Sequence, residues 1–235
     1  MSPSNWRWPR VLAHRGAGRL APENTLAALR AGARLGARGL EFDVKLSRDG
    51  VCMLLHDDTL ERTTDGRGRA SQHEWATLAR LDAGGWHSPE YAGEPPAHLA
   101  AIAAACRALG LAANVEIKPE PGLETVTGRA VARTCDALWA GIDPPPLLSS
   151  FSEPALHAAR LAAPTLPRGL LVETIPADWH ARLAALDALA LHCRHDALTA
   201  VLAADVKAAG YGLFCYTVND PARARELFGW GVDGL

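Results

Sequence analysis

Four charged clusters in this chain carry residues that could perform proton transfer and bind a metal ion. Each stands at the end of an apolar run or just beyond one: His14-Arg15-Gly16, Glu41-Phe42-Asp43, His56-Asp57 and Glu116-Ile117-Lys118. Together they supply imidazoles, carboxylates and two cations within a set of short motifs. This combination suits metal-assisted chemistry on a phosphate ester.

The spacing of the acids predicts a metal site built from oxygen ligands. Because alternate residues of a strand point to one side, Glu41 and Asp43 share a face, as do Glu116 and Lys118. Such carboxylates favour Mg²⁺ or Ca²⁺, and the lack of nearby cysteines disfavours structural zinc. The alternative is a set of ordinary surface or salt-bridged acids. It is weakened because each acid is flanked by apolar residues that would face outward.

The two histidines are candidates for a general acid and a general base. Imidazole titrates near neutral pH, so His14 and His56 could exchange protons with a substrate held at the metal. A lone histidine is more often structural, but these two stand beside the acids and cations. Arg15 and Lys118 would neutralise a phosphate group.

Short apolar runs alternate with alanine-rich helical stretches, which predicts an α/β fold with a parallel sheet and outer helices. The candidate strands are residues 11–14, 39–45, 51–56, 112–118, 147–151, 169–172, 189–193, 213–218 and 232–235. The candidate helices are residues 25–35, 97–109, 123–140, 153–162, 179–186, 198–209 and 221–228. Asn24 can cap the first helix, whose N-terminus would add backbone donors near a phosphate.

There is one more candidate strand than an eight-stranded barrel holds, and the additional strand lies within residues 39–56. Strands 39–45 and 51–56 are too close in sequence for a parallel crossover, which predicts an antiparallel hairpin. A turn centred on 48–49 sets Glu41 opposite His56, and one centred on 49–50 sets Asp43 opposite His56. Either register keeps His56 on the carboxylates' face. The other strands form the barrel, whose catalytic groups gather at the C-terminal strand ends.

Residues 58–95 interrupt the alternation of strand and helix. The stretch is rich in Gly, Asp, Arg and Thr, and it is too long for a plain loop. Its aromatic residues favour burial over a disordered linker. We therefore expect one domain over residues 1–235, with 58–95 inserted above the barrel mouth after the second strand.

Taken in order, the clusters resemble the motifs of the glycerophosphodiester phosphodiesterase family. The resemblance runs from Val11 to the C-terminus, and the whole set is specific where any single triplet is not. A further strong match is Pro22-Glu23-Asn24-Thr25. Weaker matches are Thr63-Thr64-Asp65-Gly66, Leu81-Asp82-Ala83-Gly84, Ser150-Phe151 and Thr217-Val218-Asn219.

The resemblance implies a (β/α)8 TIM barrel with a small insertion after the second strand. It also implies hydrolysis of glycerophosphodiesters to glycerol 3-phosphate and an alcohol. By the resemblance, Glu41, Asp43 and Glu116 would bind a divalent cation, and His14 and His56 would transfer protons. Arg15 and Lys118 would bind the phosphate group. The walls of the substrate pocket would include Phe151, Trp86 and Tyr216. Packing in the core or lid is an equal alternative for Trp86 and Tyr216.

The chain departs from the family pattern in three places. Tyr216 stands where the family often has tryptophan. Pro96-Ala97-His98-Leu99 replaces the usual proline–threonine–leucine. The sequence 231–235 offers only a short eighth strand where relatives normally continue, so closure of the barrel depends on very few residues.

Two other functions fit part of the pattern. A lysophospholipase D-like phosphodiesterase on larger lipids would share the chemistry but need a long apolar groove near Phe151 and the insertion. A non-catalytic barrel that binds a phosphorylated ligand is disfavoured, because both histidines and all the acids are present.

Composition sets the broader expectations. The 235 residues carry a formal net charge of −2, which gives no general attraction to nucleic acid or anionic membranes. No apolar run could cross a bilayer, and the N-terminal MSPSNWRWPR lacks a signal-peptide core. The five cysteines have no CxxC spacing, as is typical of buried reduced thiols. We expect a cytoplasmic enzyme with a small-molecule substrate, without nucleic-acid partner or stable membrane association, and of open oligomeric state.

Overall fold

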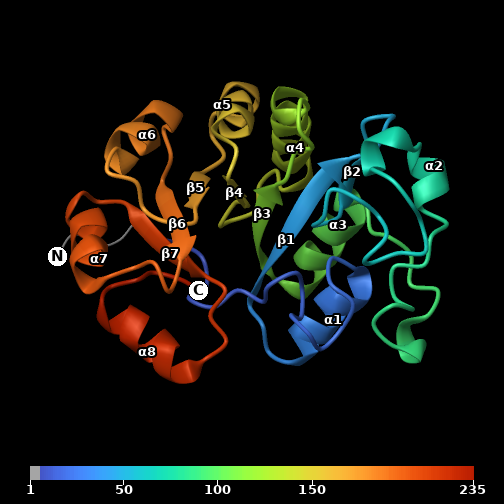
Figure 1. Cartoon of the computed structure of the whole chain (residues 1–235), viewed down its shortest axis with the longest axis horizontal. Helices are drawn as coiled ribbons and strands as arrows, with labels where there is room; N and C mark the ends of the chain where they lie inside the picture. Colours follow the sequence, from blue (N-terminus) through green and yellow to red (C-terminus); the bar gives the residue numbers. More distant parts are fainter. Residues whose placement is uncertain (1–5) are drawn as a thin grey trace.

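A computed structural model, which describes residues 6–235, shows parallel strands surrounded by helices (Figure 1). Residues 1–5 of the N-terminal segment 1–10, which was predicted to lack a signal-peptide core, lie outside the described residues. The strands are β1 (Gly39–Leu46), β2 (Cys52–Leu54), β3 (Ala112–Ile117), β4 (Leu147–Ser150), β5 (Arg168–Val172), β6 (Ala190–Arg194) and β7 (Gly212–Tyr216). Their order in the sheet is β2-β1-β3-β4-β5-β6-β7, and only β2 runs antiparallel to its neighbour.

The helices cover the outside of the strands, as the alternation in the sequence predicts (Figure 1). They are α1 (Leu26–Arg34), α3 (Leu99–Leu109), α4 (Glu124–Leu138), α5 (Glu153–Ala162), α6 (Trp179–Leu186), α7 (Ala200–Ala208) and α8 (Pro221–Gly229). The outward-facing side chains of β1, Leu40, Phe42 and Val44, are buried in the same core cluster as Leu99 of α3 and Val131 of α4. The opposite face of β1 is therefore left for the acids.

The first and last strands close the barrel with very little β-structure. Ala13 forms a single parallel bridge with Leu40, and Gly234 forms one with Phe214. The amide of Leu12 donates to the carbonyl of Leu235 at 2.8 Å, and the Leu235 amide donates to Arg10 at 2.9 Å. The strands predicted at 11–14 and 232–235 are thus bridges rather than full strands, yet they complete the predicted TIM barrel. Arg15, with φ of 52°, turns the chain out of extended geometry directly after the predicted end of the first one.

The β1–β2 hairpin forms, but in neither of the two predicted registers. Its paired residues are Val44 with Leu54, Lys45 with Met53, and Leu46 with Cys52. The ladder is therefore centred on Asp49 and, if continued, would set His56 opposite Phe42 on the helix-facing side. Strand β2 ends at Leu54, two residues before His56. The imidazole reaches the inner side because the chain has already left the ladder.

Residues 58–95 form short helical pieces around a small core of their own. These are the 3₁₀ helix η1 (Ala70–Gln72), the helix α2 (Trp75–Leu78) and the 3₁₀ helix η2 (Pro89–Tyr91). The small core contains Met53, Leu55, Leu60, Ala70 and Leu78. The segment is fixed to the barrel by polar contacts: Asp58 pairs with buried Lys45 at 3.2 Å, and Ser71 donates to buried Glu120.

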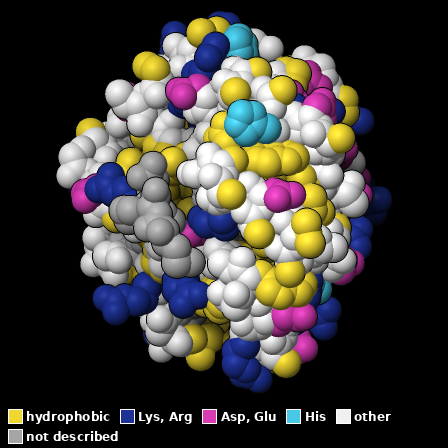
Figure 2. Space-filling model, turned by 90° about the vertical axis from the view of Figure 1, so that its left-hand side faces the viewer, with side chains coloured by type: hydrophobic (Ala, Val, Ile, Leu, Met, Phe, Trp, Pro, Cys, Tyr) yellow, Lys and Arg dark blue, Asp and Glu magenta, His cyan; other side chains and the backbone are white. Residues whose placement is uncertain are grey.

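Among the helices within residues 6–235, none is both long and apolar enough to cross a bilayer. On the face seen in Figure 2, acidic and basic side chains both occur among apolar ones. All five cysteines are buried and free of disulfides, as predicted.

The barrel interior buries a histidine that the sequence did not single out. His192 of β6 is 1% exposed, and its ring lies 5.0 Å from that of Phe214. Within the described part of the chain, neither of its ring nitrogens has a hydrogen-bond partner. Burial lowers the pKa of His192 to about 3, so this side chain is neutral in the folded protein.

Replacing His192 with phenylalanine should make the fold less sensitive to acid. An unfolded histidine has a pKa of about 6.5, and folding lowers the pKa of His192 to about 3. Between these two pKa values the unfolded chain binds one proton more than the folded protein. The free energy of unfolding is therefore highest above the upper pKa and falls as the pH drops through this range. From pH 7 to pH 5, His192 should lower the free energy of unfolding of the wild type by about 2 kcal/mol. Urea denaturation at both pH values tests this: equal losses of stability in wild type and His192→Phe would contradict it.

Candidate active site

The three predicted metal ligands converge on one face of the neighbouring strands β1 and β3. Parallel pairing sets Asp43 beside Glu116, and Glu41 lies two residues earlier on the same face of β1. One carboxylate oxygen from each of the three residues lies within 4.8 Å of the other two. Three oxygens this close can share one cation without a change of backbone.

The electrostatics of this acid cluster favour a bound cation. Burial, together with the negative charges of Asp43 and Glu116, raises the pKa of Glu41 well above its usual range. Burial and the charge of Asp43 raise the pKa of Glu116 to about 7. A hard divalent ion would displace these protons and relieve the repulsion, so the donor set fits Mg²⁺ or Ca²⁺.

Asp43 is the exception, because cations and an amide compensate its burial. Burial alone would raise its pKa, but the charges of Lys118 and Arg15 and a hydrogen bond from Asn24 hold that pKa below the ordinary value. Lys118 Nζ lies 3.4 Å from Asp43 Oδ1 and 3.1 Å from Glu116 Oε1. Asp43 is therefore the permanently charged member of the cluster.

Asn24 belongs to this site and does not cap α1, so the predicted capping role is wrong. It is 5% exposed, donates from Nδ2 to Asp43 Oδ2 at 2.9 Å, and accepts from the Asp43 amide at 3.1 Å. Its φ of 60° turns the side chain toward β1, a conformation that asparagine tolerates. The cap is instead Thr25, whose Oγ1 accepts from the Ala28 amide at 3.1 Å.

The predicted donors at the N-terminus of α1 are also already occupied. Besides the Ala28 amide bound by Thr25, the Ala27 amide donates to Glu94 Oε1 of the insertion at 2.9 Å. The Ala28 N–H is thus used by the cap of α1 itself, and the Ala27 N–H holds the insertion against this helix. The prediction that this helix start would bind phosphate is wrong for them.

His14 and Arg15 reach the acid cluster from the turn after the first strand. His14 Nε2 lies 3.8 Å from Glu41 Oε2, and the Arg15 amide donates to the same oxygen at 3.1 Å. The Arg15 guanidinium lies 3.5 Å from Asp43 and bonds Glu23 at 2.7 Å. Burial and the adjacent Arg15 charge lower the pKa of His14 to about 4, which keeps its imidazole neutral.

His56 is oriented by the residue that follows it. Its Nδ1 lies 2.7 Å from Asp57 Oδ1, so a proton on Nδ1 leaves Nε2 free as an acceptor. Burial lowers the pKa of His56, against the opposing effects of Asp43 and Asp57. Asp57 in turn accepts from Arg62, which holds the pKa of this carboxyl far below its usual range.

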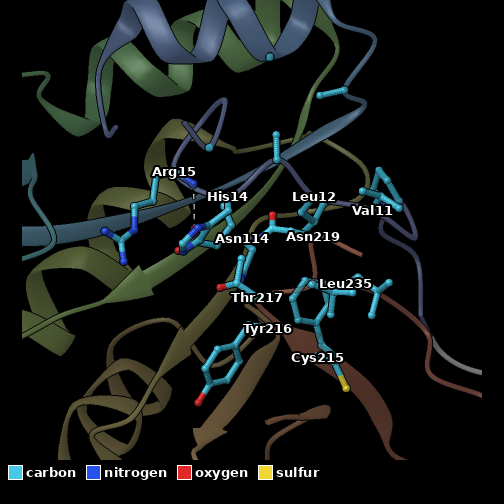
Figure 3. Close-up of a pocket in the computed structure, with 18 of the residues that line it drawn as sticks. Val11, Leu12, His14, Arg15, Asn114, Cys215, Tyr216, Thr217, Asn219 and Leu235 are labelled. Carbon is cyan, nitrogen blue, oxygen red and sulfur yellow. Dashed lines mark hydrogen bonds and ion pairs between the residues drawn. The ribbon is translucent and has the colours of Figure 1, made fainter. Parts of the chain in front are cut away.

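One cavity of about 940 Å³ joins the chemical groups (Figure 3). Of the predicted site residues, those that line it are His14, Arg15, Glu41, His56, Glu116, Lys118, Phe151 and Tyr216. In Figure 3, the Tyr216 hydroxyl points away from His14 and Asn114. That hydroxyl donates to the Val172 carbonyl at 2.8 Å. Tyr216 therefore offers its ring, packed edge-on against Phe151, rather than a hydrogen bond to a ligand.

Trp86 is not among the residues that line this cavity. Its indole N–H donates to the Ala83 carbonyl at 2.8 Å, and its ring packs edge-on against His87. These contacts place it in the packing of the insertion, the alternative considered for it from sequence.

Sequence reasoning missed the groups that orient the predicted ones. Asn24 supports Asp43, Asp57 supports His56, and Glu23 supports Arg15. Glu23 and Asn24 stand in a motif that the sequence links to the family and to a helix start, but the motif gives no role in the site for either side chain. Arg62 gave no signal, because its partners lie far from it in sequence apart from Asp57.

Comparison with known proteins places this barrel and its cavity among the phosphoric diester hydrolases. The model of the Glycerophosphoryl diester phosphodiesterase family matches residues 14–235. The chain belongs to this family and is an enzyme of its phosphodiesterase class.

Individual relatives agree with the family match. A glycerophosphodiester phosphodiesterase of Caldanaerobacter subterraneus is 31% identical over 96% of this chain and 92% of its own length. A solved phosphodiesterase of Oleispira antarctica, in complex with the product sn-glycerol-3-phosphate, is 39% identical with a TM-score of 0.93, over 97% of this chain and 92% of that one. A glycerophosphodiester phosphodiesterase structure from Agrobacterium tumefaciens has 28% identity and a TM-score of 0.80, over 96% and 94% of the two chains.

Neutralising one acid of the cluster should reveal whether it binds a cation. A carboxyl whose pKa is raised by folding destabilises the fold as pH rises from the unfolded pKa of about 4.3 to the raised value, and the cost stays at its maximum above that value. At pH 8 in EDTA, the unfolding temperature of Glu41→Gln should therefore exceed that of the wild type. The difference should be about 2–4 °C for each 1 kcal/mol by which the substitution raises the free energy of unfolding. Adding Mg²⁺ or Ca²⁺ should raise the unfolding temperature of wild type and leave Glu41→Gln nearly unchanged.

The control for this measurement is Glu74→Gln, which alters a glutamate paired with Arg48 on the exposed surface. It should respond to the ions as wild type does. Equal ion responses in wild type and Glu41→Gln would contradict a metal site at this cluster.

Proposed function

We propose that this enzyme hydrolyses glycerophosphodiesters to glycerol 3-phosphate and an alcohol, with a divalent cation and two histidines. The observation that carries the proposal is the convergence of three carboxylate oxygens within 4.8 Å, beside a cavity that both histidines line. The structure of a 39% identical relative in complex with the product sn-glycerol-3-phosphate supports the substrate class.

The acidic and basic residues of the site would bind the cation and the phosphate group, respectively. Glu41, Asp43 and Glu116 would hold Mg²⁺ or Ca²⁺, which when bound supplies positive charge for the phosphoryl oxygens. Lys118 and Arg15, both at the cavity and both paired with Asp43, add further positive charge on the protein side. The site is therefore arranged to stabilise charge that develops on phosphate in the transition state.

The two histidines would move the protons of the reaction. One accepts the proton of the attacking hydroxyl while the other donates a proton to the departing alkoxide, so that no strong base is released. Asp57 on Nδ1 presents His56 to the substrate through Nε2. Attack by water and attack by the substrate's own glycerol hydroxyl both fit this arrangement, and they differ in that only the second passes through a cyclic phosphate.

Purified enzyme with Mg²⁺ or Ca²⁺ should release glycerol 3-phosphate from glycerophosphocholine. His14→Ala and His56→Ala should each lower kcat by about 10²–10⁴-fold, the usual value of a positioned proton-transfer group. Coupled detection of glycerol 3-phosphate measures this, and chromatography of early time points detects any cyclic phosphate. Absence of turnover on a panel of headgroups with either ion would refute the proposal, and binding without turnover would instead indicate a ligand-binding barrel.

A second candidate, a lysophospholipase D-like activity, rests on apolar residues that line the same cavity. They include Leu35 at the end of α1 and Pro221 and Ala224 of α8. None of the described residues that line this cavity belongs to the insertion, where the sequence argument sought an apolar groove. Including lysophosphatidylcholine in the substrate panel separates the two: this candidate requires the higher kcat/KM for the lysolipid.

A further inference from the structure

Arg62 joins the two halves of the candidate site through a pair of carboxylates. Its NH1 and NH2 donate to Glu23 Oε2 and Oε1 at 2.9 and 2.7 Å. Its NH2 also donates to Asp57 Oδ1 at 3.0 Å, and its Nε donates to the other oxygen of Asp57. One planar guanidinium thus binds both carboxylates through two oxygens each, a geometry that a lysine cannot reproduce.

Each of these two carboxylates also contacts a side chain that lines the cavity. Asp57 Oδ1 lies 2.7 Å from His56 Nδ1, and Glu23 Oε1 accepts from Arg15 NH1 at 2.7 Å. Negative and positive charges alternate from Asp57 through Arg62 and Glu23 to Arg15, and the series begins at the imidazole of His56. The Arg15 end continues to the metal cluster, since the Arg15 amide donates to Glu41 Oε2 at 3.1 Å.

We infer that Arg62 is a positioning residue that fixes the tautomer of His56 and the place of the Arg15 guanidinium together, and this inference rests on the proposed function. Arg62 does not line the cavity, so it acts through Asp57 and Glu23 rather than on the substrate. Without it, two carboxylates would face each other with no shared cation and would turn away from His56 and Arg15. The insertion would thereby set catalytic geometry in the barrel from outside the pocket.

The kinetic test compares variants that break one branch or both. Asp57→Asn should lower kcat about 10-fold with little change in KM, because it releases only His56. Glu23→Gln should mainly raise KM, because it releases only Arg15. Arg62→Ala should do both, with kcat lower by about 10-fold, as in Asp57→Asn, and KM raised as in Glu23→Gln. Arg62→Lys should recover only part of the loss, because an ammonium cannot bind both carboxylates through two oxygens each.

A matched control separates positioning from loss of a surface ion pair. Arg48 also donates two hydrogen bonds to a carboxylate of the insertion, that of Glu74, but this pair has no link to His56. Arg48→Ala should keep kcat and KM within about twofold of wild type. In the Asp57→Asn background, Arg62→Ala should lower kcat little further, since both changes break the same branch. A full multiplicative loss, or equal effects of Arg62→Ala and Arg48→Ala, would overturn the inference.

A spectroscopic readout tests the inference independently of the substrate. Nitrogen NMR of the histidine rings, assigned with His56→Ala, should show His56 of the wild type with its proton on Nδ1. Arg62→Ala should show a mixture of tautomers, while Arg48→Ala stays as wild type. An unchanged His56 spectrum in Arg62→Ala would overturn the inference even if the enzyme is active. Changed spectra with no turnover of any glycerophosphodiester by wild type would instead count against the proposed function alone.

Discussion

Mutual repulsion among three buried carboxylates is the constraint around which this molecule is arranged. Glu41, Asp43 and Glu116 are brought together because two parallel strands end side by side, and the register of those strands leaves no freedom to separate them. Each such charge costs free energy when it is removed from water unless it is paired. The outward faces of the same strands pack against helices, so the apolar core stabilises a site that would not form by itself.

The three carboxylates differ in how far neighbouring groups compensate their charge. Asp43 has Lys118, Arg15 and Asn24 around it and stays charged, whereas burial and neighbouring charge raise the pKa of Glu41 and of Glu116. In the proposed function, a divalent cation held by the cluster would offset this repulsion, and the same cation would provide the charge that phosphate chemistry needs.

The inserted segment shows how a peripheral element can contribute to a central site. It is fixed to the barrel by its own small core and by contacts to Lys45, Glu120 and the start of α1. From that position Arg62 reaches Glu23 and Asp57, which support the two groups of opposite role, Arg15 and His56. Precision at the cavity thus comes from a polar network at its rim, where side chains remain partly exposed.

The sequence by itself determined the barrel class, the face that carries the acids, and the family. These follow from local periodicity and from motif order, which depend on residues near one another in the chain. It did not determine the hairpin register, the true cap of α1, or the partners of Asn24 and Arg62. Only the tertiary structure decided these, because a one-residue shift of a turn changes which side chains face each other, and because hydrogen bonds between distant segments exist only once the barrel has closed.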